Sequence, residues 1–132
     1  MRTQAILAGS AVTALGLTGA ACTAPSPARD YGHIPIDAFS ITAEVRAKPG
    51  KEDELRSRSL PLIDSVRSDP KNLVYFLQED RATPGRFVFY EVFANEADFE
   101  AHNNMPYVKA FLARLPELAD GGITVTRMRI LP

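Results

Sequence analysis

The segment that decides the fold reads RFVFYEVF, residues 86–93. Its odd-numbered positions hold three phenylalanines and a glutamate, and its even-numbered positions hold an arginine, two valines and a tyrosine. Successive side chains of a β-strand point to opposite faces of the sheet, so this strand is apolar on both faces. Helices can cover only one face of a small antiparallel sheet, and an apolar second face needs a cover of its own. We therefore expect a homodimer in which a second copy of the sheet supplies that cover.

Three further strands surround this one. Residues 73–80 (LVYFLQED) precede it, and the turn at residues 82–85 (ATPG) makes the two strands an antiparallel hairpin. The opening strand, residues 39–47, alternates strictly between apolar and polar side chains, as expected of a half-buried strand. The closing strand, residues 123–131, alternates as well. The chain thus supplies four strands for one antiparallel sheet.

Helices are expected in the remaining stretches. Residues 52–68 form the first, with acidic side chains in the first turn and a kink at Pro61. Asn95 caps a short second helix, with an aspartate three positions on as in a capping box. Pro106 begins the last helix, which ends at residues 120–122 (DGG). The order of elements is therefore β-α-β-β-α-β, which is a ferredoxin-like α+β fold with an antiparallel sheet.

The first 21 residues are predicted to be a signal peptide. Arg2 supplies a positive charge, and residues 5–21 are uncharged, small and apolar. This run is too short for a comfortable membrane span, and it lacks the amphipathic spacing of a core helix. We therefore expect an exported protein of the periplasm or cell envelope.

Cys22 follows this run and is the single cysteine of the chain. The two alanines before it resemble the lipobox of bacterial lipoproteins, in which the cysteine is lipidated and becomes the new N-terminus. Gly19 departs from that pattern, which has Leu, Val or Ile at this place. Ordinary cleavage after Ala21 or near Ala28 is the alternative, and it would give a plain secreted protein. A lipid on Cys22 is the one membrane attachment that we expect, and a lone cysteine allows no intramolecular disulfide.

Residues 22–37 are predicted to be a flexible tether, and residues 38–132 to be one folded domain. The tether has three prolines and mostly small or polar side chains, which give it little to bury. The whole chain is 45% hydrophobic, with 15 basic against 16 acidic residues. That balance argues against nucleic acid as the main partner, because such a partner calls for a basic stripe.

Glu91 and His102 are the candidate catalytic pair. Alternation places Glu91 among the phenylalanines of its strand, where a carboxylate must be hydrogen-bonded, have a raised pKa or line a solvated cavity. Phe99 precedes His102 by about one helical turn, which indicates that both side chains point inward. A helix packed on the hairpin can then bring His102 to Glu91, as a base and the carboxylate that orients it.

Two other interpretations of these residues stay open. An inward histidine can be a structural residue of the core or of a helix end. Glu91 can instead form a salt bridge with Arg127 or Arg129 on the closing strand.

Metal and nucleotide sites are not expected. The chain has two histidines, one of them His33 in the tether, and it has no cysteine pair. No glycine-rich phosphate loop precedes a helix.

Four stretches carry a resemblance to a known family: residues 48–51 (KPGK), 89–93 (FYEVF), 95–97 (NEA) and 101–111 (AHNNMPYVKAF). From about residue 41 to residue 131 the chain resembles the antibiotic biosynthesis monooxygenase family. Its members are small dimeric α+β barrels and include cofactor-free quinol monooxygenases. The same barrel also serves haem-degrading enzymes, isomerases and proteins without known activity, so the motifs are more specific for fold than for function.

Two positions depart from the family pattern. Members often carry Trp where Phe93 stands, and this chain has no tryptophan. Many members carry His where Tyr107 stands. The missing tryptophan argues against the tryptophan-dependent chemistry of some members. It also argues against haem degradation, for which His102 is the one residue in support and no second motif is present.

The resemblance implies an oxidoreductase that needs no metal or flavin cofactor. It would insert oxygen from dioxygen into a small quinol or polyphenol-type aromatic, with His102 removing a phenolic proton. The implied substrate-binding residues are the four aromatics and one amide Phe89, Phe93, Tyr107, Phe111 and Asn103. The alternatives are a non-catalytic small-ligand-binding barrel and an isomerase on the same fold.

Overall fold

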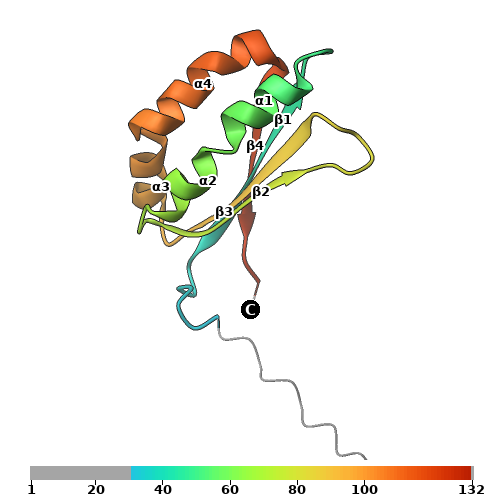
Figure 1. The fold of residues 1–132 in the computed structure, drawn as a ribbon. Helices are drawn as coiled ribbons and strands as arrows, with labels where there is room; N and C mark the ends of the chain where they lie inside the picture. Colours follow the sequence, from blue (N-terminus) through green and yellow to red (C-terminus); the bar gives the residue numbers. More distant parts are fainter. Residues whose placement is uncertain (1–30, 132) are drawn as a thin grey trace, which may run out of the picture.

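One four-stranded antiparallel sheet organises the computed structural model, which describes residues 31–131. Its strands are β1 (Phe39–Ala47), β2 (Asn72–Glu79), β3 (Arg86–Phe93) and β4 (Ala119–Arg129). They lie in the order β2-β3-β1-β4, and each neighbouring pair is antiparallel. The helices α1 (Glu52–Ser59), α2 (Leu62–Arg67), α3 (Glu96–Asn103) and α4 (Pro106–Leu118) cover one face of the sheet (Figure 1). The predicted ferredoxin-like α+β fold is confirmed.

The helix predicted over residues 52–68 is divided into α1 and α2. Pro61 lies between them and is the N-cap residue of α2, with a φ of −64°. A proline has no backbone N–H to continue the hydrogen-bond ladder, and its ring collides with the carbonyl four residues back. The prediction of one kinked helix is therefore wrong, because Pro61 separates two short helices.

No helix within residues 31–131 is long and apolar enough to cross a membrane.

The glycine pair Gly121–Gly122 lies inside β4, although the sequence indicated that it ends α4. The helix already ends at Leu118. The pairing of β4 with β1 shifts register between Val45 and Arg46, and both glycines opposite this shift have a φ of 74°. Glycine adopts that region without strain, so the pair accommodates an irregularity within the strand.

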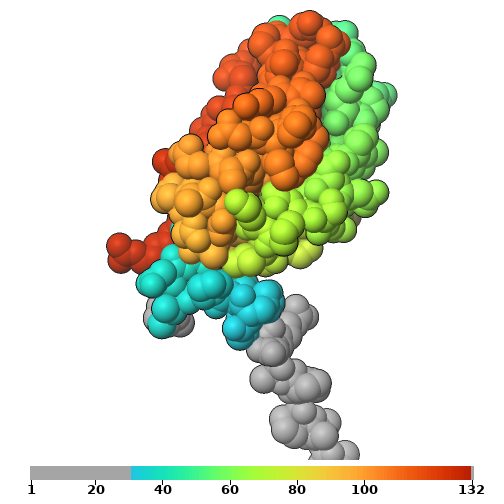
Figure 2. Space-filling model, turned by 90° about the vertical axis from the view of Figure 1, so that its left-hand side faces the viewer, coloured from blue at the N-terminus to red at the C-terminus, as the bar shows by residue number. Residues whose placement is uncertain are grey.

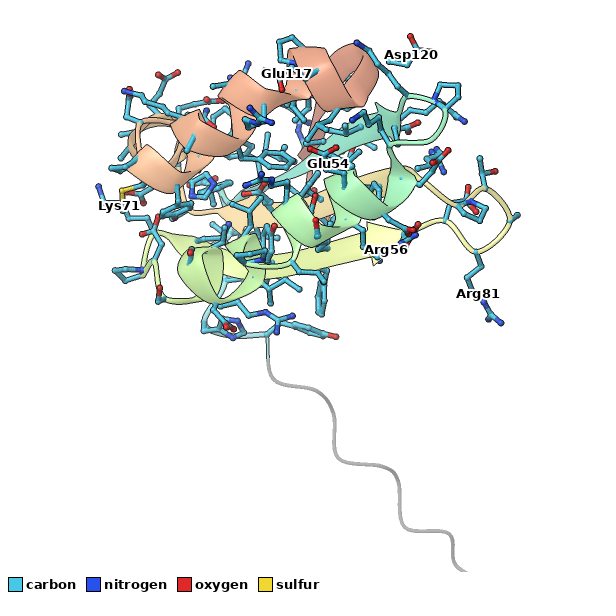
Figure 3. The ribbon with its side chains drawn as sticks, turned by 45° about the horizontal axis from the view of Figure 1, so that its top comes forward. Glu54, Arg56, Lys71, Arg81, Glu117 and Asp120 are labelled. Carbon is cyan, nitrogen blue, oxygen red and sulfur yellow. The ribbon has the colours of Figure 1, made fainter. Side chains whose placement is uncertain are left out.

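Arg56 ties α1 to the edge of the sheet. Its Nε donates to Oε2 of Glu79 at 2.8 Å, and its Nη2 donates to Oε1 of the same carboxylate at 2.7 Å. A bidentate contact of this kind fixes the relative orientation of the two side chains and also adds electrostatic attraction. Figure 3 shows Arg56 near the end of β2, while Arg81 projects away from the sheet from the β2–β3 loop. The helical layer is thereby held in place over β2.

The core lies between the helical layer and the sheet. Strands β1 and β3 contribute the side chains that alternate onto this face, Ile41, Ala43, Val45, Phe87, Phe89 and Phe93. Leu55 of α1 and Leu118 of α4 meet them and are 0% and 1% exposed. Figure 2 shows α4 packed alongside α1 and α2, which closes the layer from outside.

The other face of the sheet is apolar as well. Phe76 of β2 is 52% exposed there. The register of the hairpin places three more apolar or aromatic side chains on this face, Val74, Tyr90 and Val92. Residues 31–37 form turns at its edge and help to line a depression of about 660 Å³ over these side chains. The second apolar face inferred from the sequence is thus present, and its cover by a second copy stays a prediction.

Candidate functional site

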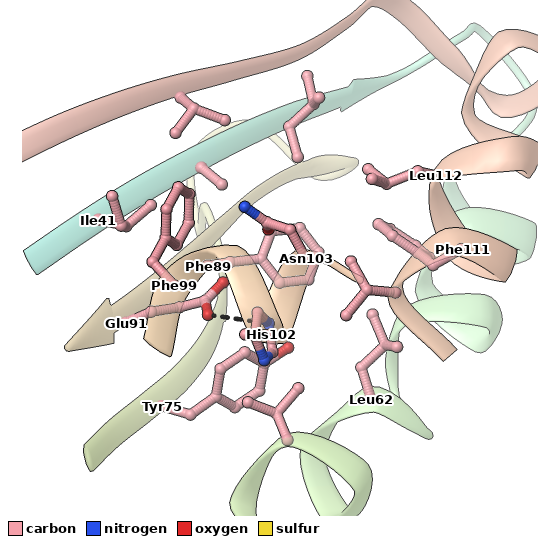
Figure 4. A pocket seen from close by; sticks show the side chains of 15 residues that line it. Ile41, Leu62, Tyr75, Phe89, Glu91, Phe99, His102, Asn103, Phe111 and Leu112 are labelled. Carbon is pink, nitrogen blue, oxygen red and sulfur yellow. Dashed lines mark ion pairs between the residues drawn. The ribbon is translucent and has the colours of Figure 1, made fainter. Parts of the chain in front are cut away.

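A cavity of about 250 Å³ lies between the sheet and the helices. Most of its wall is apolar and includes Ile41, Val66, Phe99, Phe111, Leu112 and Val125. Four polar side chains interrupt this wall, Tyr75, Glu91, His102 and Asn103. Figure 4 shows Tyr75, Glu91 and His102 gathered on one side, with Phe111 and Leu112 across from them. An apolar cavity with a few convergent polar groups is typical of a small-molecule site.

The sequence of α3 explains why His102 faces this cavity. The helix begins at the Asn95 cap, whose side chain accepts the backbone N–H of Asp98 at 2.9 Å. Asn95 also donates from its side-chain Nδ2 to the Asp98 carboxylate at 3.0 Å. In a full capping box that carboxylate would instead accept the backbone N–H of Asn95. With the start of the helix fixed, Phe99 and His102 fall on the same inward side and are 8% and 4% exposed.

His102 lies between two carboxylates. Its Nδ1 is 3.4 Å from Oδ2 of Asp69, and its Nε2 is 3.4 Å from Oε2 of Glu91. Both distances exceed those of ordinary hydrogen bonds, as is common for catalytic contacts before a substrate binds. The structure therefore brings together Glu91 and His102, the pair that the sequence indicated. Sequence reasoning missed Asp69, which follows α2 and reaches His102 only through the folding of the chain.

Glu91 is held by the strand next to its own. Asn72, at the start of β2, donates from Nδ2 to Oε2 of Glu91 at 3.0 Å. The alternative salt bridge from Glu91 to Arg127 or Arg129 is wrong, because Glu91 takes its polar contacts from Asn72 and the histidine. Arg127 instead places its guanidinium over the ring of Phe99, 5.1 Å from the ring centre.

Burial reverses the usual order of the two pKa values. It raises the pKa of Glu91 to about 7, partly offset by the hydrogen bond from Asn72. Burial also lowers the pKa of His102 below 6.5, partly offset by the hydrogen bond and charge of Asp69. At neutral pH the imidazole is therefore mainly uncharged, and Glu91 is close to its titration midpoint. A neutral imidazole beside such a carboxyl group is suited to general acid–base chemistry.

Three of the expected substrate-binding residues line the cavity, Phe89, Asn103 and Phe111. Phe93 does not, because it lies beneath α3 and is 0% exposed. Its ring centre is 5.2 Å from that of His102, so it supports the imidazole from behind. The expectation that Phe93 forms part of the cavity wall is corrected accordingly.

Tyr107 also stands behind the site and is not part of the cavity wall. It lies in the first turn of α4, and its ring centre is 6.0 Å from that of His102. This corrects the second of the expected wall positions, since Tyr107 packs on the imidazole that faces the cavity. The expected lipidation site, Cys22, lies outside the described residues.

Several buried polar atoms near the pair lack partners. The hydroxyls of Tyr75 and Tyr107 and Oδ1 of Asn72 make no hydrogen bond within residues 31–131. A buried group left in that state costs about 1–3 kcal/mol. Tyr75 lines the cavity and stands opposite Glu91 in the β2–β3 register, and burial and the nearby Glu91 raise its pKa. Sequence reasoning missed Tyr75, although the hairpin register carries a signal for it.

The cavity therefore offers proton transfer, hydrogen bonding and apolar packing. Within residues 31–131 no three His, Cys, Asp or Glu side chains cluster in a way that could hold a metal ion. His102 and Glu91 are the paired titratable side chains of the cavity wall, with Asp69 behind the ring, and Tyr75 and Asn103 add a hydroxyl and an amide.

Sequence comparison identifies the family of the chain and two similar proteins. The family model described as "Antibiotic biosynthesis monooxygenase" matches residues 38–114. "Putative monooxygenase YcnE" of Bacillus subtilis is 28% identical over 90 residues, which cover 68% of this chain and 95% of that protein. "Uncharacterized protein sll1783" of Synechocystis is 30% identical over 82 residues, 62% of this chain. That match spans 56% of the Synechocystis protein, little more than half of its length.

A solved structure shares the fold. PA3566 from Pseudomonas aeruginosa matches with a TM-score of 0.69 and 22% identity, covering 73% of this chain and 96% of that one. At this level of identity the likeness concerns the fold alone. The family match, by contrast, runs from the start of β1 into α4 and includes both Glu91 and His102. The chain therefore belongs to the antibiotic biosynthesis monooxygenase family.

Proposed function

We propose that this protein is a monooxygenase that works without a metal or flavin and oxidises a quinol or polyphenol-type aromatic with dioxygen. One observation carries the proposal: His102 borders an apolar cavity and lies 3.4 Å from a carboxylate on either side. A base held in this way can take a phenolic proton. Family membership supports the class of reaction, since the Bacillus relative bears the name of a monooxygenase.

Proton removal starts the reaction. Nε2 of His102 takes the proton of a phenolic hydroxyl, and the resulting phenolate is rich enough in electrons to reduce dioxygen, which then bonds to a ring carbon. Loss of water leaves a hydroxyquinone, so one oxygen atom enters the product and the other leaves as water. The quinol supplies all four electrons, and no separate reductant is needed. Glu91, beside Nε2, takes the proton onward from His102 to the reduced oxygen.

The cavity limits the substrate. Its volume of about 250 Å³ is smaller than the clefts of roughly 300–1,000 Å³ that hold drug-sized ligands, which favours one ring or two fused rings. Phe89 and Phe111 offer apolar surface to such a ring and exclude water from the phenolate. The Asn103 amide, also in the wall, can hold a second phenolic or carbonyl oxygen.

Oxygen uptake with isotope-labelled dioxygen tests the reaction. The purified protein, treated with a chelator, is supplied with dihydroxybenzenes and dihydroxynaphthalenes, and the spontaneous rate is subtracted. The proposal requires uptake that depends on the protein, one labelled oxygen atom in the product and the other in water. Binding of these compounds without oxygen uptake would overturn the proposal that the protein is an enzyme. It would identify a barrel that only binds small ligands.

Assembly and location belong to the same proposal. The exposed Phe76 and the apolar side chains around it favour a homodimer joined through the open sheet faces. The uncharged run at residues 5–21 favours export to the periplasm or cell envelope. Cys22 follows that run and favours a lipid anchor as the link to the membrane.

A further inference from the structure

Asp69 is a buried carboxylate fixed by its own turn. It is 5% exposed and lies between α2 and β2. Its backbone N–H donates to the carbonyl of Val66 at 3.0 Å, and its carbonyl accepts the N–H of Asn72 at 3.1 Å. Its Oδ1 accepts the backbone N–H of Lys71 at 3.0 Å. These contacts leave Oδ2 directed at Nδ1 of His102, 3.4 Å away.

A carboxylate in this position needs more than one backbone donor. Burying a charge is costly unless it is paired and hydrogen-bonded. The two basic side chains nearest to it in the sequence have other partners. Arg67 donates from Nη2 to the carbonyl of Tyr75 at 3.4 Å, and Nζ of Lys71 lies 3.8 Å from the carboxylate of Asp98. The imidazole N–H of His102 is therefore the side-chain partner that compensates Asp69.

We propose that Asp69 is the positioning residue of the site, accepting the Nδ1–H of His102 and so holding the tautomer whose bare Nε2 faces the substrate. This inference rests on the proposed function, in which Nε2 is the base. Asp69 lies behind the ring, outside the set of residues that line the cavity, and so acts through His102. Asp69 takes the orienting role that the sequence predicts for Glu91, because Glu91 lies at the other nitrogen of the ring.

The surroundings of His102 fit this division of roles. The titratable groups that face its ring are Asp69 from the turn after α2, Glu91 from β3, Tyr75 from β2 and Tyr107 from α4. Once Nε2 has taken a proton, the charge of Asp69 stabilises the imidazolium from the opposite nitrogen. Asp69 opposes the lowering of the His102 pKa by burial, so its loss should lower that pKa further.

Nitrogen NMR of labelled histidine tests the tautomer without any turnover. The chain has two histidines, so His33 serves as an internal reference for His102. In the wild type we expect a protonated Nδ1 and a bare Nε2 on neutral His102. In Asp69→Asn the amide can donate to Nδ1, so the proton should move to Nε2 and the titration midpoint of His102 should fall. Asp64→Asn, the same change on α2 outside the site, should alter neither.

Turnover supplies the second arm. Asp69→Asn should lower kcat by about two to four orders of magnitude with a small change in KM, as expected for a base left in the wrong tautomer. Protonated Nε2 in the wild type would overturn the inference even if the variant fails to fold. A folded Asp69→Asn protein with an unchanged tautomer and an unchanged kcat would also overturn the inference. If only the melting temperature of that variant falls, Asp69 is a structural carboxylate. Wild-type protein without oxygen uptake would count against the proposed function, and the NMR result would still decide where Asp69 holds the proton.

Discussion

The imidazole of His102 and the carboxylate of Glu91 lie 3.4 Å apart, although one comes from a helix and the other from a strand beneath it. The cap at Asn95 sets the start of α3, and the alternation of β3 sets the face on which Glu91 lies. Both side chains are buried as a result, at 4% and 9% exposure. Folding therefore changes the proton affinity of each, which makes the pair accessible to experiment before any substrate is known.

Glu91 should make the folded protein less stable as pH rises. Its pKa is about 7 in the folded protein, against an ordinary value of 4.5. Between these values the folded state keeps a proton that the unfolded state has lost. The stabilisation from this group is therefore fully present below pH 4.5, and it is lost progressively as the pH rises to about 7. Glu91→Gln cannot ionise. Its free energy of unfolding should rise relative to the wild type by up to about 3 kcal/mol over this range.

Urea denaturation of both proteins at several pH values measures this difference. His102 acts in the opposite sense, because its lowered pKa makes the folded state lose stability as pH falls below 6.5. Both proteins contain His102, so the comparison largely removes its contribution. Parallel stability curves for the wild type and Glu91→Gln would contradict the raised pKa.

Removing the hydroxyl of Tyr75 should not destabilise the ligand-free protein. That hydroxyl is buried without a hydrogen-bond partner within residues 31–131, so Tyr75→Phe takes away an uncompensated polar group. The melting temperature should stay the same or rise. Tyr90→Phe, the same change on the opposite face of the sheet, is the matched control. A loss of more than about 1 kcal/mol in Tyr75→Phe alone would show that a bound water or another group satisfies the hydroxyl.

The strands could be predicted from the sequence because their signal is local. Alternation with a period of two is written into each strand, and the predicted bounds of β1 and β3 match the structure. The break at Pro61 and the position of the glycine pair inside β4 differ from the prediction. In both places the structure depends on where a helix ends. Packing against the rest of the fold decides that point, and the residue type alone does not.

The site could be predicted in part for the same reason. Helical spacing turned His102 inward, and strand alternation put Glu91 on the same side of the sheet. Asp69 could not be found, because a turn after α2 brings it to Nδ1 of His102 and no repeating pattern marks a turn. Phe93 belongs to the same face as the cavity-lining Phe89, and only the packing of α3 over it seals it from the cavity.

A negative charge on the open sheet face should disrupt assembly. Phe76 is 52% exposed on that face, and a second copy of the sheet would bury it. Sedimentation of residues 31–132 at micromolar concentration should show a dimer, and Phe76→Glu should sediment as a monomer with its helical signal retained. Arg81→Glu, a charge change in the β2–β3 loop, is the control that should stay dimeric. A wild-type monomer would end the dimer proposal.

Lipidation of Cys22 can be tested in cells. Labelled palmitate should enter the full-length protein in a bacterial host, and Cys22→Ser should abolish the labelling. Ser10→Ala, a change within the uncharged run, should leave labelling intact. Unlabelled protein with a mature N-terminus elsewhere would support plain secretion, and a retained N-terminal segment would contradict export.

Oxygen uptake and melting temperature, measured on one preparation of His102→Gln, test whether His102 is the base. Glutamine keeps a polar group of similar size against Phe93 and Tyr107, where alanine would also leave a packing defect. With 1,4-dihydroxynaphthalene as substrate, we predict a rate per folded molecule about two to four orders of magnitude below that of the wild type. His33→Gln, the same change outside the site, should keep the wild-type rate. A folded His102→Gln protein with the wild-type rate would show that His102 is not the base.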